Sequence, residues 1–191
     1  AGAGVGTSGG SIAFNIKENN WLGEGKKVGF EIELSNESLK GKFDYTNPNY
    51  DFLGNAINYS LYSSNNDKPT QGYENTLIGA GVTTSFEQYK DLYAKLGLNA
   101  SYDNLKTQSS ASSSLKKHSG TYNEIAGLYG FTYDKRNRSF MPTDGYISSF
   151  TQELPLYSDR GSISNTLATS LYKTVTENII GASKFYFKSV N

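Results

Sequence analysis

The sequence of 191 residues contains no cysteine, and His118 is its single histidine. The lack of cysteine excludes disulfide frameworks, thiolate zinc sites and cysteine nucleophiles, and one histidine leaves almost no room for a Ser-His-Asp triad. No run approaches the roughly 18 to 20 apolar residues of a membrane-spanning helix. The first residues lack the charged and apolar regions of a signal peptide, and we expect the chain to be a piece of a longer protein.

The charges are balanced, with 18 Lys and Arg against 18 Asp and Glu, and the pI is about 6.8. This balance argues against a broad nucleic-acid interface, which needs clustered cations to neutralise phosphates. The mean hydropathy of -0.54 is low, yet 14% of the residues are aromatic. Disordered polar chains contain few aromatics and soluble cores need more aliphatic carbon, so these rings serve something other than a conventional core.

The dominant pattern along the chain is an alternation of apolar and polar residues in segments of about ten residues, separated by Gly, Asn, Asp and Ser. The stretch 104–120 is rich in serine and too polar to bury, and it is predicted to be a long solvent-exposed loop. Because the other connections are short, the strands are predicted to be antiparallel. We predict about eleven of them, over residues 1–7, 10–19, 26–35, 38–47, 54–64, 73–86, 91–103, 121–134, 145–155, 162–172 and 177–189.

One hairpin can be registered from the sequence alone, with Asn36 and Glu37 as a two-residue turn. On one face of this hairpin opposite charges pair, and on the other face apolar side chains pair. A soluble sandwich would bury the apolar face, whereas a membrane barrel would place it in lipid and the charges in a polar lumen. The predicted pairs, which fit both folds, are Glu33 with Lys40, Glu31 with Lys42, Leu34 with Leu39 and Phe30 with Phe43.

Three features favour a transmembrane barrel over a sandwich. Strands of about ten residues or more match a tilted crossing of the hydrocarbon layer, whereas soluble strands usually run nearer five or six. Aromatic residues, such as Trp21, Phe43 and Tyr146, gather near predicted strand ends and turns, as interfacial girdles require. Short connections also alternate with longer ones. The residues predicted to face lipid include Phe14, Phe30, Ile32, Phe43, Leu96 and Leu98.

Other motifs have simpler structural interpretations than a catalytic or binding role. Gly4 to Gly9 spell G-x-G-x-x-G, but an alternating strand follows where a dinucleotide site needs a helix, so we predict a glycine-rich strand and turn. Glu31 and Glu33 fit a charge ladder better than an acid/base pair. His118 is predicted to be a solvated loop residue. The cations of segment 135–138 fit a solvated turn before Pro-Thr-Asp-Gly better than a contact with anionic lipid.

Four segments together resemble the C-terminal barrel of the BamA-type outer-membrane assembly family. They are 4–10, which is glycine-rich; 19–25, with Asn-Asn-Trp-Leu-Gly; 45–50, with Tyr-Thr-Asn-Pro; and 133–145, with Tyr-Asp-Lys-Arg and Phe-Met-Pro-Thr-Asp-Gly. They occur in the family order and together cover essentially the whole chain. The turn residues that match are Asn20, Trp21, Leu22, Gly23, Asn47, Pro48, Asp134, Arg136, Phe140, Pro142, Thr143, Asp144 and Gly145.

The resemblance implies an all-β fold, an antiparallel transmembrane β-barrel of sixteen strands in the bacterial outer membrane. Residues 1–191 would be the N-terminal portion of this barrel, with about eleven strands, preceded by periplasmic repeats. It implies a protein that folds and inserts other barrels and is not an enzyme, with no cofactor and no metal. The implied partners are unfolded outer-membrane β-barrel proteins as substrates, membrane lipid and accessory assembly lipoproteins, but no nucleic acid.

In that family the first strand pairs weakly with the last and opens as a lateral gate. Small residues suit this role because they weaken a strand and leave backbone groups free to pair with an incoming strand. The family's lid loop and closing strands are missing here, and eleven strands alone would leave two unpaired edges that lipid cannot satisfy. The matching gate edge is Ala1, Gly2, Ala3, Gly4, Val5, Gly6 and Thr7.

Alternative functions remain open at this point. A two-partner-secretion transporter or an autotransporter assembly factor would share the fold but move a chain through the lumen. A passive porin-like channel would need no weak seam and no assembly partner. A soluble β-sandwich adhesin would bind through its loops and stay outside membranes.

Overall fold

The computed structural model describes residues 2–6 and 9–191, and these form one sheet of eleven strands with a single short helix, α1 (Ser113–Lys117). In residues 2–6 and 9–191 no helix is long and apolar enough to cross a membrane. The strands are β1 (Gly2–Gly6), β2 (Gly9–Trp21), β3 (Lys26–Ser35), β4 (Ser38–Asn47), β5 (Ala56–Lys68), β6 (Tyr73–Tyr89), β7 (Leu92–Thr107), β8 (Gly120–Asp134), β9 (Gly145–Ser158), β10 (Ser164–Thr176) and β11 (Ile179–Val190).

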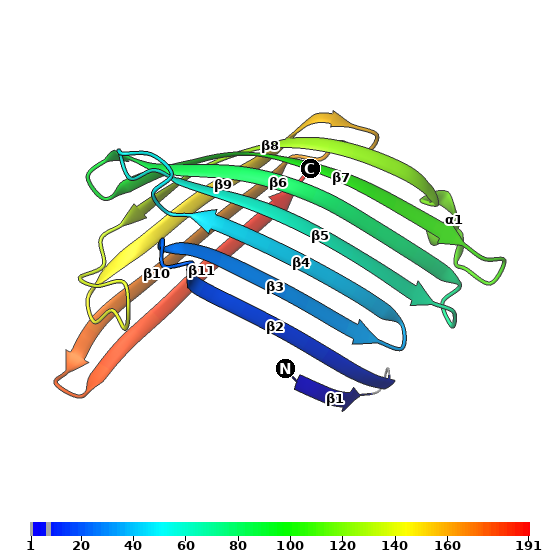
Figure 1. The fold of residues 1–191 in the computed structure, drawn as a ribbon, viewed down its shortest axis with the longest axis horizontal. Helices are drawn as coiled ribbons and strands as arrows, with labels where there is room; N and C mark the ends of the chain where they lie inside the picture. Colours follow the sequence, from blue (N-terminus) through cyan, green and yellow to red (C-terminus); the bar gives the residue numbers. More distant parts are fainter. Residues whose placement is uncertain (1, 7–8) are drawn as a thin grey trace.

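Every strand pairs with its neighbours in chain order, and every pairing is antiparallel. The sheet curls over at β8, so that β9, β10 and β11 run behind β2 to β5 in Figure 1. Within the described residues β1 and β11 do not pair with each other, and the sheet stays open. An antiparallel sheet of long, curled strands confirms the predicted fold class.

The predicted strands agree with the structure to within four residues at each described end. The strands β6 and β7 are 17 and 16 residues long and extend beyond the predicted segments. The connection between β7 and β8 is therefore 108–119, shorter than the predicted loop 104–120, and it contains α1. Ser112 caps this helix by accepting a hydrogen bond from Leu115 N at 3.3 Å. The sequence did not predict this helix, because five residues are too few to show a helical periodicity.

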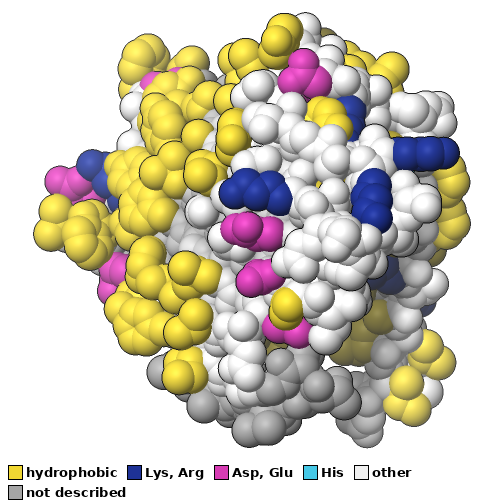
Figure 2. All heavy atoms as spheres, turned by 90° about the vertical axis from the view of Figure 1, so that its right-hand side faces the viewer, with side chains coloured by type: hydrophobic (Ala, Val, Ile, Leu, Met, Phe, Trp, Pro, Cys, Tyr) yellow, Lys and Arg dark blue, Asp and Glu magenta, His cyan; other side chains and the backbone are white. Residues whose placement is uncertain are grey.

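The sheet has an apolar face and a polar face, because side chains alternate along each strand. The described residues include no large side chain that is fully buried, and the buried hydrophobic residues are the small Ala94, Ala111 and Ala126. Seen from the right-hand end of Figure 1, hydrophobic side chains gather at the left of the molecule and charged and polar ones lie at its centre (Figure 2). The strand register places the predicted lipid-facing residues together on the apolar face, namely Phe14, Phe30, Ile32, Phe43, Leu96 and Leu98.

The predicted register of the β3–β4 hairpin is confirmed in all four pairs. Lys40 Nζ lies 3.1 Å from Glu33 Oε2, as the pairing across the turn requires. Lys42 faces Glu31 in the register, yet its Nζ lies 2.8 Å from Asp44 Oδ2 on its own strand. The long lysine side chain reaches either carboxylate, so register alone did not identify its ion-pair partner. Among the predicted girdle aromatics, Trp21 and Tyr146 do lie at strand ends, whereas Phe43 lies in the middle of β4.

On the polar face, a tyrosine of β5 lies across β6 and reaches β7. Tyr62 is the register partner of Gly79, and its hydroxyl accepts a hydrogen bond from Asn99 Nδ2 at 3.0 Å. Gly79 leaves the space that the ring occupies, since a Cβ there would lie 2.6 Å from Tyr62 Cε2. This contact ties three strands together on the polar face.

The connections between strands fall at two ends of the sheet. One end carries 22–25, 48–55, 90–91, 135–144 and 177–178, and we call it the motif end because the turns of the sequence motifs lie there. The opposite end carries 36–37, 69–72, 108–119 and 159–163. The antiparallel topology thus gathers segments that are more than a hundred residues apart in the chain.

Candidate functional site

The predicted gate edge is the short strand β1, whose pairing with β2 covers five residue pairs from Gly2 with Ala13 to Gly6 with Gly9. By comparison, the β6–β7 ladder runs from Tyr73 to Tyr89. Glycine in a strand has high conformational entropy to lose and no side chain to pack, so a short ladder with glycine on both sides is weak. Ala1 and Thr7, which belong to the predicted edge, lie outside the described residues.

The first motif turn, 22–25, joins β2 to β3 in a left-handed conformation. Leu22, Gly23 and Gly25 have φ values of 55°, 77° and 70°. The Asn20 side chain closes the turn, because its Oδ1 accepts a hydrogen bond from Gly25 N at 2.6 Å. Leu22 is 79% exposed at the tip. The turn residues predicted from the family motif thus have a structural role in shaping this connection.

The second motif turn, 48–55, is organised by one carboxylate. Asp51 Oδ1 accepts hydrogen bonds from Leu53 N and Asn55 N, each at 3.0 Å, and Asp51 Oδ2 accepts one from Asn55 Nδ2 at 2.7 Å. Partial desolvation favours a higher pKa for the Asp51 carboxyl, but the hydrogen bonds from Asn55 and Leu53 outweigh it and lower the pKa. The loop begins directly after Asn47, the last residue of β4, whose Oδ1 accepts a hydrogen bond from Asn49 N at 3.2 Å. The backbone of this loop is therefore held in one conformation.

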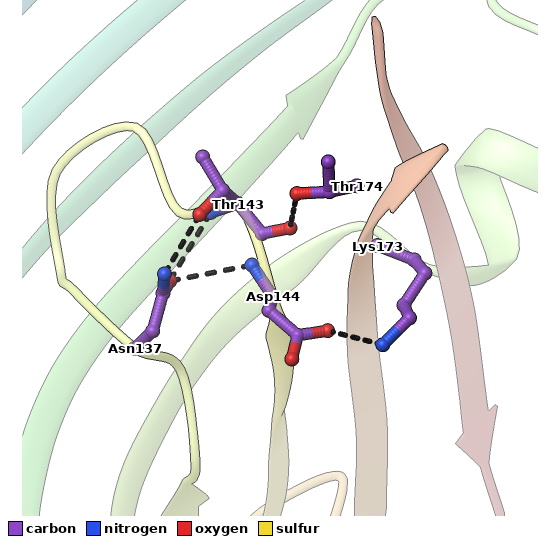
Figure 3. Close-up of polar contacts among 5 residues, drawn as sticks. All are labelled: Asn137, Thr143, Asp144, Lys173 and Thr174. Atoms are coloured by element: carbon purple, nitrogen blue, oxygen red, sulfur yellow. Dashed lines mark hydrogen bonds and ion pairs between the residues drawn. The ribbon is translucent and has the colours of Figure 1, made fainter. Parts of the chain in front are cut away.

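The third motif segment, 135–144, is the most extensively bonded connection at the motif end. Asn137 lies at its centre and bonds to Thr143 and Asp144 across the loop, as Figure 3 shows. Asn137 Nδ2 donates to Thr143 Oγ1 at 2.7 Å, and Asn137 Oδ1 accepts from Thr143 N at 3.1 Å. From β10, Lys173 Nζ lies 3.1 Å from Asp144 Oδ1 and Thr174 Oγ1 donates to the Thr143 carbonyl at 3.0 Å. The loop is thereby fastened to a strand that is not its neighbour in sequence.

Two further contacts hold the start of this loop. Arg136 makes a bidentate pair with Asp134, with Nε to Oδ1 at 2.8 Å and Nη2 to Oδ2 at 2.7 Å. Lys135 Nζ lies 2.6 Å from Asp91 Oδ2 in the β6–β7 turn. Gly145 closes the loop with a φ of 95°, and a Cβ at this position would collide with the Lys135 carbonyl. Only glycine fits both the backbone angle and the space.

The electrostatics of this loop favour charged carboxylates. The hydrogen bond and charge of Lys173 hold the pKa of Asp144 below its usual value. Phe140 and Met141, by contrast, lie at the tip with exposures of 79% and 66%. The hydrogen bonds and ion pairs therefore hold the charged part of the loop in place, while the apolar tip remains exposed.

The other predicted residues differ in whether they make polar contacts. Phe140 has no polar side-chain group, and it is exposed at the loop tip. The charge-ladder residues Glu31 and Glu33 lie on the polar face of β3, as predicted. His118 is exposed at the end of α1, but its Nδ1 lies 2.8 Å from the Ser114 carbonyl, so it does have a local partner. In the part of the chain that the structure describes, no group of three or more His, Cys, Asp or Glu lies together where it could hold a metal ion.

The sequence did not single out three residues that organise the motif end. Asn137, Lys173 and Asp91 each complete a contact with the 135–144 loop. Asp91 and Lys173 come from distant strand ends, and only the strand pairing brings them to the loop. The one available signal was Asn137, since asparagine inside a turn-forming segment commonly bonds to the nearby backbone.

The architecture agrees with known proteins. Residues 20–191 match the Omp85 superfamily domain, which is most of the chain. The chain belongs to the Omp85 superfamily. A curated Omp85 relative, named outer membrane protein assembly factor BamA, from Neisseria meningitidis serogroup B (strain ATCC BAA-335 / MC58), is 22% identical over 162 residues, which cover 76% of this chain and 20% of that protein.

A solved structure supports the same fold. The crystal structure of BamA from Haemophilus ducreyi lacking POTRA domains 1–3 aligns with a TM-score of 0.73 at 21% identity, over 96% of this chain and 39% of that chain. The chain thus spans about a fifth of the curated relative and under half of the solved one. Membership of the Omp85 superfamily identifies the chain as β-barrel sequence of the bacterial outer membrane, and it accounts for an apolar face that covers no core.

Proposed function

We propose that the protein to which this chain belongs folds and inserts β-barrel proteins into the outer membrane, with β1 as the edge that receives the incoming strand. The observation that carries this proposal is the short, glycine-rich β1–β2 ladder at the border of a sheet whose other ladders are long. Backbone groups on an edge strand can pair with an extended segment of another chain.

The mechanism requires no covalent chemistry. An incoming strand pairs with β1 and gains backbone hydrogen bonds that it cannot find in hydrocarbon. Weak pairing between β1 and its neighbours lowers the cost of exchanging one partner strand for another. The remaining strands then add in sequence until the new barrel closes on itself. The protein acts as a non-enzymatic assembly factor, with unfolded barrel proteins as substrates and with accessory lipoproteins and membrane lipid as partners.

The same proposal covers the organisation of the whole protein. Residues 1–191 form the N-terminal portion of a barrel of sixteen strands, which further strands close and which periplasmic repeats precede. The motif turns at 22–25, 48–55 and 135–144 act as rigid supports at one rim of this barrel. Their hydrogen bonds hold the strand ends in place while the β1 edge exchanges partners.

The proposal is tested by strengthening β1. In the full-length protein, Gly2→Val combined with Gly4→Val raises the strand propensity of β1 and should slow the folding of a model outer-membrane barrel into proteoliposomes several-fold. Gly41→Val is the matched control, because Gly41 lies in an inner strand where no other heavy atom comes within 4 Å of a new Cβ.

Each outcome separates the candidate functions. Slower client folding in the β1 variant with normal folding in the Gly41→Val control supports assembly through this edge. Equal client folding rates in both variants would refute the role of β1. A steady ion conductance with no acceleration of client folding by the unmodified protein would instead identify a passive channel.

A further inference from the structure

The loop 48–55 is joined to the apolar face of the sheet by a groove. The β4–β5 connection, coloured cyan, reaches across the ends of the following strands in Figure 1. Beside it lies a groove of ≈ 590 Å³. Its principal lining residues are Tyr50 from the loop and, from the strands, Ile57, Leu96, Leu98, Tyr129 and Leu154.

All the strand residues in this lining belong to the apolar face. Ile57 pairs through Thr84 with Leu96, and Leu96 pairs with Tyr129 across the next ladder. Leu98 and Leu154 both pair with Gly127 one step further along. Gly127 contributes only backbone to the lining. The groove therefore opens on the surface that meets the hydrocarbon of the outer membrane.

Beside loop 48–55 the apolar band starts directly at the motif end, with Ile57 on β5, whereas on β3 and β4 it extends to Leu34 and Leu39 at the opposite end. Along β7 the residues on this face are Ala94, Leu96, Leu98, Ala100 and Tyr102, and the next one is the polar Asn104. Because β7 begins at the motif end, the band lies against the turns there and leaves the other end of the strand polar. Loop 48–55 therefore lies at the border between hydrocarbon and head groups, where tyrosine and other aromatic residues are favoured.

The loop also exposes apolar side chains that its own fold cannot cover. Phe52 is 97% exposed and Leu53 is 73% exposed. The Asp51 hydrogen bonds hold the backbone on either side of them, and Gly54 with a φ of 79° completes the turn. An ordered loop that presents two large apolar side chains is an informative exception to the ordinary protein surface.

We propose that this groove binds one acyl chain of a membrane phospholipid, with Tyr50 as its wall on the loop side and with Phe52 and Leu53 inserted beside the same lipid. The occupant is lipid because the groove is continuous with the lipid-facing band and because most of its strand lining is aliphatic, with Thr84 and the Tyr129 hydroxyl as its polar groups. The site is separate from the β1 edge, so it stands whether or not β1 receives an incoming strand.

The test uses the full-length protein in vesicles of phosphatidylethanolamine that contain a small fraction of phospholipid with a photoreactive diazirine in the middle of one acyl chain. After irradiation, labelled peptides are mapped by mass spectrometry. The segments with Tyr50, Leu98 and Tyr129 should carry at least five times more label than the apolar face of β2, with Ile12, Phe14 and Ile16. Heat-modifiable gel migration confirms that each variant contains a folded barrel.

Two variants with matched controls address the groove and the loop separately. Val82→Phe fills the groove and should reduce labelling there about fivefold, whereas Ile78→Phe, on the same face of the same strand but outside this groove, should leave it unchanged. Phe52→Ser should also reduce labelling, whereas Phe140→Ser, at another exposed tip of the same end, should not.

Two results would overturn the proposal. Even labelling over the whole apolar face that is insensitive to Val82→Phe would mean that the groove holds only exchanging bulk lipid. A groove that takes up no label while the surrounding apolar face is labelled would mean that lipid does not enter it.

Discussion

Gly79→Ala should destabilise the sheet through a single displaced side chain. The new Cβ would lie 2.6 Å from Tyr62 Cε2, well inside van der Waals contact. The ring must leave its place, and with it the hydrogen bonds between the Tyr62 hydroxyl and Asn99, at 3.0 and 3.3 Å, are lost. Two hydrogen bonds at about 0.5 to 1.5 kcal/mol each and a strained rotamer at a similar cost give a loss of about 1.5 to 4.5 kcal/mol.

Urea unfolding of the full-length protein in vesicles measures this loss, and the midpoint should fall by roughly 1 M. Gly41→Ala is the control: nothing lies near its new Cβ, and alanine should be neutral or stabilise by about 0.5 to 1 kcal/mol. In a Tyr62→Ala background, Gly79→Ala should lose most of its cost, because the ring that it displaces is gone. Equal stability of Gly79→Ala and Gly41→Ala would refute the reasoning.

Three further predictions concern the motif end and the two faces of the sheet. Gly145→Ala should open the 135–144 loop to proteases, since alanine is strained at a φ of 95° and meets a backbone carbonyl; unchanged cleavage would contradict this. The Asp144–Lys173 contact should hold the loop at neutral pH and be lost as the pH falls through the lowered pKa of Asp144, so protease sensitivity should rise in acid and Asp144→Asn should abolish that pH dependence. Phe30→Lys should cost about 2 to 4 kcal/mol on the apolar face, whereas Glu31→Gln on the polar face should change the unfolding midpoint little.

Much of the fold was predictable because a strand is a local pattern. Alternation with a period of two, as in Phe30, Ile32 and Leu34, requires only neighbouring residues, and the turn at Asn36 and Glu37 set the register of a whole hairpin. The strand ends were less certain. β7 continues to Thr107 through polar residues because it pairs with β6 as far as Tyr73, and that support comes from another strand.

The residues of the candidate site were likewise predictable only where the neighbouring sequence specifies their conformation. Asn20, Asp134 and Gly145 lie at strand ends beside turns whose own residues specify the conformation, and sequence motifs identified them. Asp91 and Lys173 act on the 135–144 loop from two other strand ends, and no spacing in the chain relates them.

The sequence by itself determined that the chain is an antiparallel sheet with one apolar face, because alternation and turn residues act over a few positions. Only the tertiary structure decided which turns meet at the motif end, that Tyr62 reaches Asn99 over Gly79, and that loop 48–55 borders a groove on the apolar face. These contacts join strands that curl toward one another, and the curvature of a sheet depends on all its strands together.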